Sequence, residues 1–318
     1  MSEIGLGAWQ LGGADWGDMS ATRAFEILGA AADAGVTFID TADVYGLGRS
    51  EQLIGQWLGN RSDRERFFVA TKIGRFPKPG WPENFTAEVV RAHVDACRQR
   101  LGVSTLDLVQ LHCVPIETLR QGAMFATLRE LKAEGKIKAF GASIETVDQA
   151  LYALSVDGLA SLQVIHNILR QPMNIRVFLE AKKKDVSIIV RLPLASGLLS
   201  GKMRADQPFA NNDHRLYNRD GEAFYVGETF NGLTLEKGVE LIERVRPLVP
   251  ASMNMAQFAL RWCLDHDAVT TVIPGASSPE QARGNAAVSD MAPIDRGALV
   301  RLRAFYGTEV APFIRGGV

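Results

Sequence analysis

The sequence has few cysteines, and those it has are poorly placed for pairing. Only 3 occur among 318 residues, Cys97, Cys113 and Cys263, and none belongs to a CxxC motif. This spacing argues against a disulfide framework and against a thiolate zinc site. Unpaired thiols persist best in a reducing compartment, so we expect a cytoplasmic protein.

The sequence also lacks an excess of one charge and long apolar runs. Lys and Arg number 35 against 36 for Asp and Glu, a formal net charge of −1, which favours neither nucleic acid nor an anionic membrane as a partner. No apolar run approaches the ~18 residues that a membrane span needs. No HxH, HExxH or acidic cluster indicates a metal site. We therefore predict no metal, no nucleic-acid partner and no membrane partner.

A strand–helix unit repeats along the chain. Eight short segments rich in β-branched and apolar residues alternate with helical patterns, and the expected strands are residues 4–9, 37–40, 67–72, 106–112, 137–143, 161–167, 186–193 and 269–275. This alternation predicts an α/β fold, a parallel (β/α)8 TIM barrel with long loops at its C-terminal face, formed as a single domain over residues 1–318. An open doubly wound sheet is the alternative. It would be expected to show a GxGxxG turn directly after the first strand, and GLGAWQLGG lacks that spacing.

Four titratable residues stand at or just after the ends of the second, third and fourth predicted strands. Asp40 ends the strand in FIDTADVYG, which also delivers Tyr45, whereas Lys72 ends FFVATK and His112 ends LDLVQLH. Neighbouring strands of a parallel barrel lie ~4.8 Å apart and end at one mouth, so these side chains are expected to share one pocket. Lys72 follows an apolar run and tolerates burial only beside a carboxylate, which Asp40 supplies.

These four residues suggest proton transfer. At ~4 Å and an effective dielectric of ~20, an ammonium stabilises a phenolate by about 4 kcal/mol, so Lys72 is expected to lower the pKa of Tyr45 from ~10 by at most about three units. Such a phenol can donate a proton near neutral pH. His112 can hydrogen-bond the same substrate oxygen and orient it.

Motifs along nearly the whole chain resemble one enzyme family. In order, DTADVYG, ATKIG, VQLH, GAS, a Gln on the sixth strand, PLASGLLSGK and VIPGASSPEQARGN are similar to the aldo-keto reductase superfamily, particularly its bacterial members with long C-terminal loops. The resemblance implies a catalytic tetrad of Asp40, Tyr45, Lys72 and His112, with Tyr45 as the acid/base. It also implies an NADP(H)-dependent oxidoreductase that reduces an aldehyde or ketone to an alcohol, or the reverse, by hydride transfer.

The resemblance further implies where the cofactor binds. The matching positions are Ser143 and Gln163 for the nicotinamide carboxamide, Gly275, Ser277, Gln281 and Asn285 around the adenosine phosphate and adenine, and Trp9, Arg191, Leu192, Leu194, Gly197 and Lys202 elsewhere. The last loop lacks the Lys and Arg that grip the 2′-phosphate in the better-known branches. NADP is therefore expected from the family, and NAD is not excluded.

The position of Arg191 departs from the family pattern. Many relatives have there a Tyr whose ring stacks on the nicotinamide. A guanidinium is also planar and can stack on the ring, where its charge would disfavour the oxidised, cationic nicotinamide. Alternatively, Arg191 swings away and pairs with a loop carboxylate.

Relatives also carry a hairpin that plugs the bottom of the barrel, ahead of the position that matches Ile4. Either the plug is absent or the true start lies upstream; without a plug, an apolar floor with side chains such as Ile4 and Leu6 is expected to be exposed. We expect a small-molecule carbonyl or alcohol as the partner and a monomer or small homo-oligomer. Two other functions stay open, namely a cofactor-binding regulatory barrel subunit with little turnover and a barrel hydrolase or isomerase.

Overall fold

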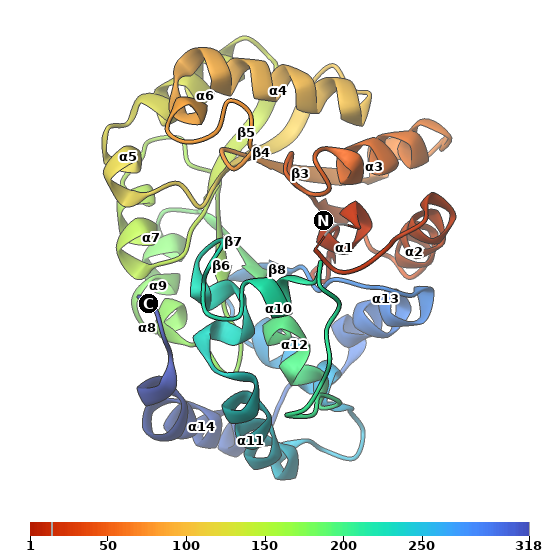
Figure 1. Cartoon of the computed structure of the whole chain (residues 1–318), viewed down its shortest axis with the longest axis vertical. Helices are drawn as coiled ribbons and strands as arrows, with labels where there is room; N and C mark the ends of the chain where they lie inside the picture. The colour runs from red at the N-terminus through yellow and green to blue at the C-terminus, as the bar shows by residue number, and fades with distance from the viewer. Residues whose placement is uncertain (14, 318) are drawn as a thin grey trace.

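Eight parallel strands form the centre of the molecule, in the order of the chain (Figure 1). The computed structural model describes residues 1–13 and 15–317. The strands are β1 (Leu6–Gly7), β2 (Phe38–Asp40), β3 (Phe68–Ile73), β4 (Leu106–His112), β5 (Ile137–Ser143), β6 (Ser161–Ile165), β7 (Ser187–Arg191) and β8 (Val269–Val272). Backbone hydrogen bonds from Gly5 to Val272 and from Gly7 to Pro274 close β8 onto β1. The predicted (β/α)8 barrel is confirmed.

Helices surround the strands (Figure 1). They are α1 (Trp9–Gly12), α2 (Ala21–Asp33), α3 (Arg49–Gly59), α4 (Ala87–Leu101), α5 (Ile116–Arg120), α6 (Ala123–Ala133), α7 (Val147–Ala153), α8 (Pro172–Arg176), α9 (Phe178–Lys183), α10 (His214–Tyr217), α11 (Leu235–Val245), α12 (Met255–Leu264), α13 (Pro279–Ala286) and α14 (Arg296–Phe305). Side-chain oxygens of Ser20, Thr86 and Thr146 accept N-terminal amides of α2, α4 and α7, which satisfies donors that a helix start leaves free. None of the helices in the described ranges is long and apolar enough to cross a membrane.

Side chains alternate along each strand between the outer helices and the barrel interior. On β4, Val109 and Leu111 belong to the main core around the strands, whereas Leu108 lies in a small separate cluster with Phe38 and Ile273. The ladder pairs Lys72 with Gln110 and His112 with Ser143. Because side chains alternate with a period of two, this register places Lys72, His112 and Ser143 on the interior side, at the carboxyl ends of the strands.

The expectation of an exposed barrel floor is wrong. Ile4 and Leu6 are 1% and 3% exposed, because they face outward from β1 into the main core. The interior itself is filled by apolar side chains, and the rings of Phe38 and Phe68 stack there with centroids 5.8 Å apart. Apolar side chains below the candidate site therefore cover one another.

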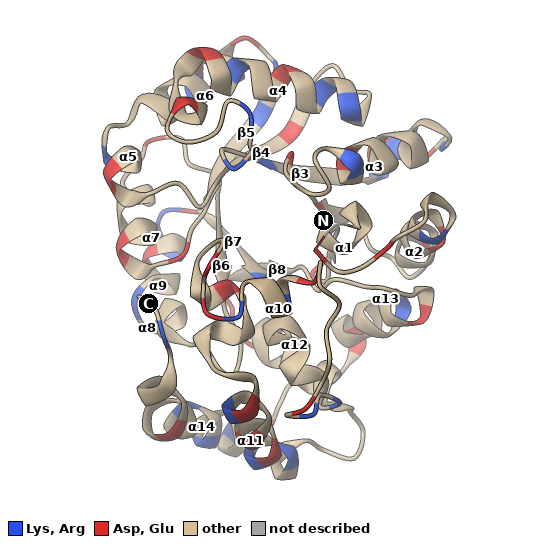
Figure 2. Cartoon of the chain, in the orientation of Figure 1, with Lys and Arg blue, Asp and Glu red and all other residues tan. Residues whose placement is uncertain are grey.

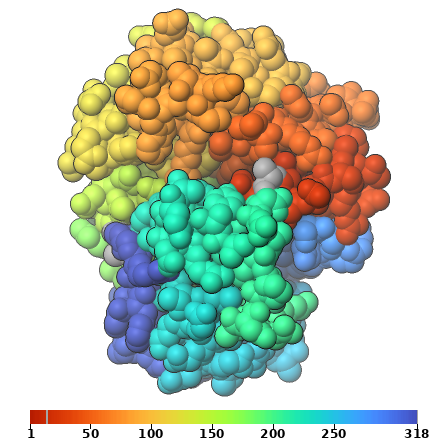
Figure 3. All heavy atoms as spheres, in the orientation of Figure 1, coloured from red at the N-terminus to blue at the C-terminus, as the bar shows by residue number. Residues whose placement is uncertain are grey.

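The long segment between β7 and α11 crosses the open end of the barrel, and Figure 3 shows these green and cyan residues against the red N-terminal residues. The segment is irregular apart from short helical turns, which include η3 (Ala195–Ser200), α10, η4 (Val226–Glu228) and η5 (Phe230–Gly232). Because it crosses the open end, the segment contributes residues to the mouth of the barrel, where the strand ends converge. On the surrounding helices, residues of both charge signs are interspersed (Figure 2).

Candidate active site

Lys72 connects the candidate tetrad at the bottom of the mouth. Its Nζ donates to Asp40 Oδ2 at 2.6 Å and to the carbonyl oxygen of Thr41 at 2.8 Å, and it lies 3.2 Å from the Tyr45 hydroxyl. The Lys72 side chain is fully buried and that of Asp40 is 3% exposed. A buried ammonium is tolerated when a carboxylate and further acceptors surround it, as they do here.

Burial raises the pKa of Tyr45, whereas the charge of Lys72 was expected to lower it. The pKa of Tyr45 is raised, because burial of the phenol outweighs the opposing charge of Lys72, and Asp40 adds to the rise. The expected lowering of this pKa is therefore wrong for the protein alone. Burial also lowers the pKa of His112 well below its usual value, helped by the charges of Arg75 and Lys72, so this imidazole is neutral.

A cavity of about 1600 Å³ opens above the tetrad. Of the residues predicted from the sequence, those that line it are Trp9, Asp40, Tyr45, His112, Gln163, Arg191, Leu192, Leu194, Gly197, Lys202, Gly275, Ser277, Gln281 and Asn285. Lys72 and Ser143 do not line it and are buried behind it. Gln163 donates from Nε2 to Asp40 Oδ1 at 2.7 Å, a contact that the sequence did not predict.

Polar side chains after β8 form hydrogen bonds with one another and with the backbone of the loop. Gln281 Oε1 accepts from the backbone N and the Oγ of Ser277, at 2.8 and 3.0 Å, and Asn285 donates to the Gly275 carbonyl at 3.3 Å. A Cβ on Gly275 would lie 2.2 Å from the side chain of Gln10. A side chain at position 275 would therefore displace the end of the Gln10 side chain on α1.

The sequence did not predict a partly buried ionic cluster beside His112, in which only Glu228 is fully buried. Arg75 donates to Glu145 at 2.9 Å and to both carboxylate oxygens of Glu228 at 3.0 and 3.2 Å. Arg75 and Glu145 closely follow the motifs ATKIG and GAS, so strand-end position was a usable signal for them. Glu228 lies in the irregular segment, where no pattern in the sequence indicates its position.

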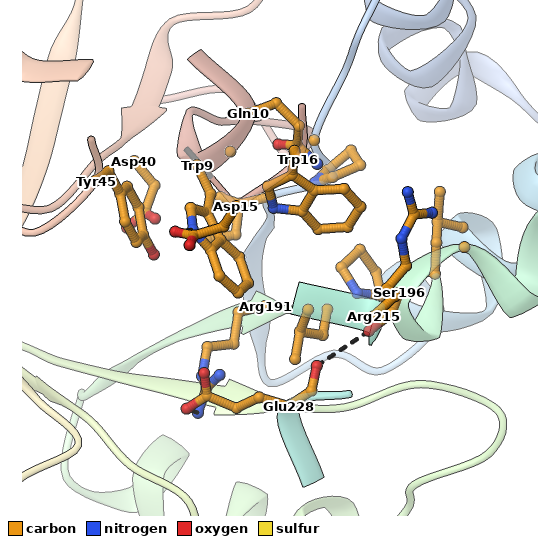
Figure 4. A pocket seen from close by; sticks show the side chains of 18 of the residues that line it. Trp9, Gln10, Asp15, Trp16, Asp40, Tyr45, Arg191, Ser196, Arg215 and Glu228 are labelled. Carbon is orange, nitrogen blue, oxygen red and sulfur yellow. Dashed lines mark hydrogen bonds and ion pairs between the residues drawn. The ribbon is translucent and has the colours of Figure 1, made fainter. Parts of the chain in front are cut away.

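Arg191 belongs to the same cluster, and Figure 4 shows it beside Glu228. Its Nη2 lies 3.4 Å from Glu228 Oε1 and 3.4 Å from the Cys113 sulfur. Of the two alternatives for Arg191, the pairing with a loop carboxylate is present in this structure. Burial raises the pKa of Cys113 to about 12, although Arg75 and Arg191 oppose the rise, so the thiol stays protonated.

Aromatic rings form the wall nearest Tyr45. Trp9 stacks on Tyr45 with ring centroids 5.7 Å apart and packs against His214 at 4.7 Å. Asp15 connects this wall to α10, because its carboxylate accepts from Trp9 Nε1 at 2.9 Å and from the Tyr217 hydroxyl at 2.5 Å. Trp9, Tyr45 and Asp15 lie together in Figure 4.

The sequence and the fold are similar to those of known proteins. The profile of the aldo/keto reductase family matches residues 3–306. The aldo-keto reductase YhdN of Bacillus subtilis (strain 168) is 30% identical over 290 residues, which cover 88% of this chain and 82% of the relative. The NADH-specific methylglyoxal reductase of Escherichia coli (strain K12) is 30% identical over 304 residues, 90% of this chain and 89% of the relative.

A solved structure agrees with these relatives. The glycerol dehydrogenase AKR11B4 from Gluconobacter oxydans superposes with a TM-score of 0.78 at 26% identity, and the alignment covers 100% of this chain and 94% of that one. The family profile spans nearly the whole chain, and two relatives reach 30% identity over most of it. The chain therefore belongs to the aldo/keto reductase family of oxidoreductases.

Proposed function

We propose that this protein reduces an aldehyde or ketone to an alcohol, or catalyses the reverse reaction, with NADP(H) as the hydride carrier and Tyr45 as the general acid/base. The observation that carries the proposal is the single ammonium of Lys72 in contact with both Asp40 and the Tyr45 hydroxyl at the base of the cavity. The bound nicotinamide supplies the hydride. Everything else in the reaction is assigned to side chains of this chain.

The residues present fit a dinucleotide. Arg191 lines the cavity, and its Nε is buried without a partner in this structure, so it can donate to a polar group of a bound ligand. Lys202, Ser277, Gln281 and Asn285 line the same cavity and would hold the adenosine end. The cavity is also larger than the ~300–1,000 Å³ of common ligand sites, which leaves room for both cofactor and substrate.

Tyr45 would hold the proton and Lys72 would make its release possible. As charge develops on the substrate oxygen, the phenol donates its proton, and the resulting phenolate is stabilised by the ammonium 3.2 Å away. The neutral His112 supplies a hydrogen bond that orients the oxygen. Trp9 stacks on Tyr45 and Phe224 packs against Trp9, and both rings line the cavity and exclude water from the reacting atoms.

The choice between NADP and NAD rests on charge around the adenosine. Arg23, Lys202 and Arg215 line the cavity and favour a phosphorylated cofactor, whereas Glu280 also lines it and opposes one. The E. coli relative is named NADH-specific, so both cofactors have to be compared. We propose NADP as the preferred form, and a single-domain enzyme over residues 1–318.

The test follows the absorbance of the reduced nicotinamide with each cofactor and a panel of aldehydes and ketones. Tyr45→Phe is expected to leave the cofactor dissociation constant nearly unchanged and to lower kcat by ~10² to 10⁴, because a general acid is lost. A variant that keeps more than about a tenth of kcat would contradict the role of Tyr45. A wild-type protein that binds the cofactor without turning over any carbonyl would instead support the regulatory alternative.

A further inference from the structure

Glu228 lies between two arginines at the reacting end of the cavity. Its carboxylate accepts from Arg75 at 3.0 and 3.2 Å and from Arg191 at 3.4 Å, and its side chain is 4% exposed. Figure 4 shows the head groups of Arg191 and Glu228 against each other. One carboxylate therefore faces two guanidinium charges.

The backbone fixes Glu228 in this position. It ends η4, and its carbonyl oxygen accepts from Ser196 Oγ at 3.0 Å while its N–H donates to the Tyr225 carbonyl at 3.0 Å. Its carboxylate also lies 3.7 Å from the Cys113 sulfur. The long segment thus delivers one acidic side chain to the ends of β3, β4 and β7.

Among the described residues, no other carboxylate forms an ion pair with Arg191. Within residues 1–13 and 15–317, Glu228 is the only acidic side chain paired with Arg191, whereas Arg75 also contacts Glu145. The other contacts of Arg191 are the Cys113 sulfur and the Ile144 carbonyl oxygen, which carry no full charge. The Glu145 charge also acts on Arg191, but less than that of Glu228, and its carboxylate accepts from Arg75. Removal of the Glu228 charge would therefore leave two guanidinium groups facing one carboxylate.

Arg191 lies close enough to the tetrad for its charge to matter there. It lines the cavity with Asp40 and Tyr45, and its charge helps to lower the pKa of both groups against the effect of burial. Hydride transfer requires the nicotinamide to lie beside the carbonyl that Tyr45 protonates. The charge balance at Arg191 therefore acts on the ring, which is cationic only in its oxidised form.

We propose that Glu228 is a positioning residue that neutralises Arg191 and so allows the site to hold the oxidised nicotinamide nearly as well as the reduced one. The inference rests on the proposed function. Through Glu228, the segment that covers the barrel would thus allow the reaction to run in both directions. Without Glu228, the site would favour the reduced cofactor and release the oxidised one.

The test compares dissociation constants of NADP⁺ and NADPH by fluorescence titration. Glu228→Gln keeps the size and the hydrogen-bonding oxygen but removes the charge, and it is expected to raise the ratio of the oxidised to the reduced constant about fivefold to tenfold. In the Glu228→Gln/Arg191→Gln double variant the ratio should return to within about twofold of wild type. Glu243→Gln, which removes an exposed partner of Arg246, is the matched control.

Four outcomes separate the possibilities. An unchanged ratio in Glu228→Gln overturns the inference, and so does a raised ratio that persists in the double variant, because the effect would then not act through Arg191. Should Glu228→Gln fail to fold, Arg191→Gln alone is expected to lower the ratio, and an unchanged value overturns the inference. If wild type binds neither cofactor form, the proposed function itself fails.

Discussion

Tyr45 and Lys72 show how burial and charge compete at a single residue. The ammonium lies 3.2 Å from the phenol oxygen, yet burial still raises the pKa of Tyr45. Removing an ionised group from water costs several kcal/mol, which is as large as the attraction of one nearby charge. In the proposed mechanism, Lys72 therefore limits the rise in this pKa, so that the phenolate stays accessible during turnover.

Glu145 provides a prediction about pH and stability. Burial raises its pKa to about 7, Glu228 adds to the rise and Arg75 opposes it. A raised pKa means that the folded state keeps the proton longer than the unfolded state, so this stabilising contribution is complete below the unfolded value near 4.5 and is lost as the pH rises through about 7. Relative to Glu145→Gln, wild type is expected to lose about 1 to 3 kcal/mol of unfolding free energy across that window.

Urea unfolding of both proteins at several pH values measures this difference. Glu228 titrates lower, because Arg75 and Arg191 outweigh its burial and hold its pKa at about 2, so it contributes little to the same window. The exposed Glu243→Gln serves as the control that should show no such trend. If the difference in unfolding free energy between wild type and Glu145→Gln stayed constant with pH, Glu145 would not titrate near neutral pH.

Among the structural elements, α10 joins two segments that cover the cavity. His214, at its start, is fully buried and packs its ring against Trp9 and Trp16, with centroids 4.7 and 4.5 Å away. The His214 amide donates to the Asp15 carbonyl at 3.0 Å. The loop after β1 and the long segment after β7 are thus attached to each other above Tyr45.

Removal of one of these attachments should speed ligand exchange. Tyr217→Phe removes the 2.5 Å hydrogen bond to Asp15, and a hydrogen bond to a charged group contributes about 1.5 to 3 kcal/mol. We expect release of NADPH to accelerate by about tenfold in stopped-flow displacement, with a smaller change in the thermal midpoint. Tyr152→Phe, on α7, is the comparison variant, and equal release rates in the two variants would show that α10 does not control exit.

At the scale of the whole molecule, Arg170 connects segments that are far apart in the chain. It is 2% exposed and donates to the Asn231 carbonyl at 3.1 Å, the Tyr225 hydroxyl at 2.5 Å and the Gly317 carbonyl at 2.6 Å. Tyr225 and the residue at position 317 are themselves hydrogen-bonded. The last residues of the described chain therefore help to hold the segment that carries Glu228.

Loss of this connection should destabilise the fold. Arg170→Met keeps much of the apolar stem but leaves buried acceptors unpaired, and we expect the unfolding free energy to fall by about 2 to 4 kcal/mol. Differential scanning calorimetry measures the change, with Arg176→Met at an exposed site of α8 as the control. A midpoint as high as that of the control would show that Arg170 does not hold these segments.

The barrel and the tetrad could be predicted from the sequence because both depend on local order. Strand–helix alternation is set by the period of the apolar residues, and Asp40, Lys72 and His112 stand at strand ends that any parallel barrel brings together. The loop from Gly275 to Asn285 was likewise recognisable from its motif and lies in the cavity.

Only the tertiary structure decided the charge balance around these residues. Glu228 pairs with Arg191 across 37 positions of irregular chain, and no periodicity determines which side chain of such a segment reaches the mouth. The sign of the pKa shift of Tyr45 depends on how completely other segments cover it, as does the burial of Ile4 and Leu6. Burial is a sum over contacts that are distant in sequence, so it is defined only once the chain has folded.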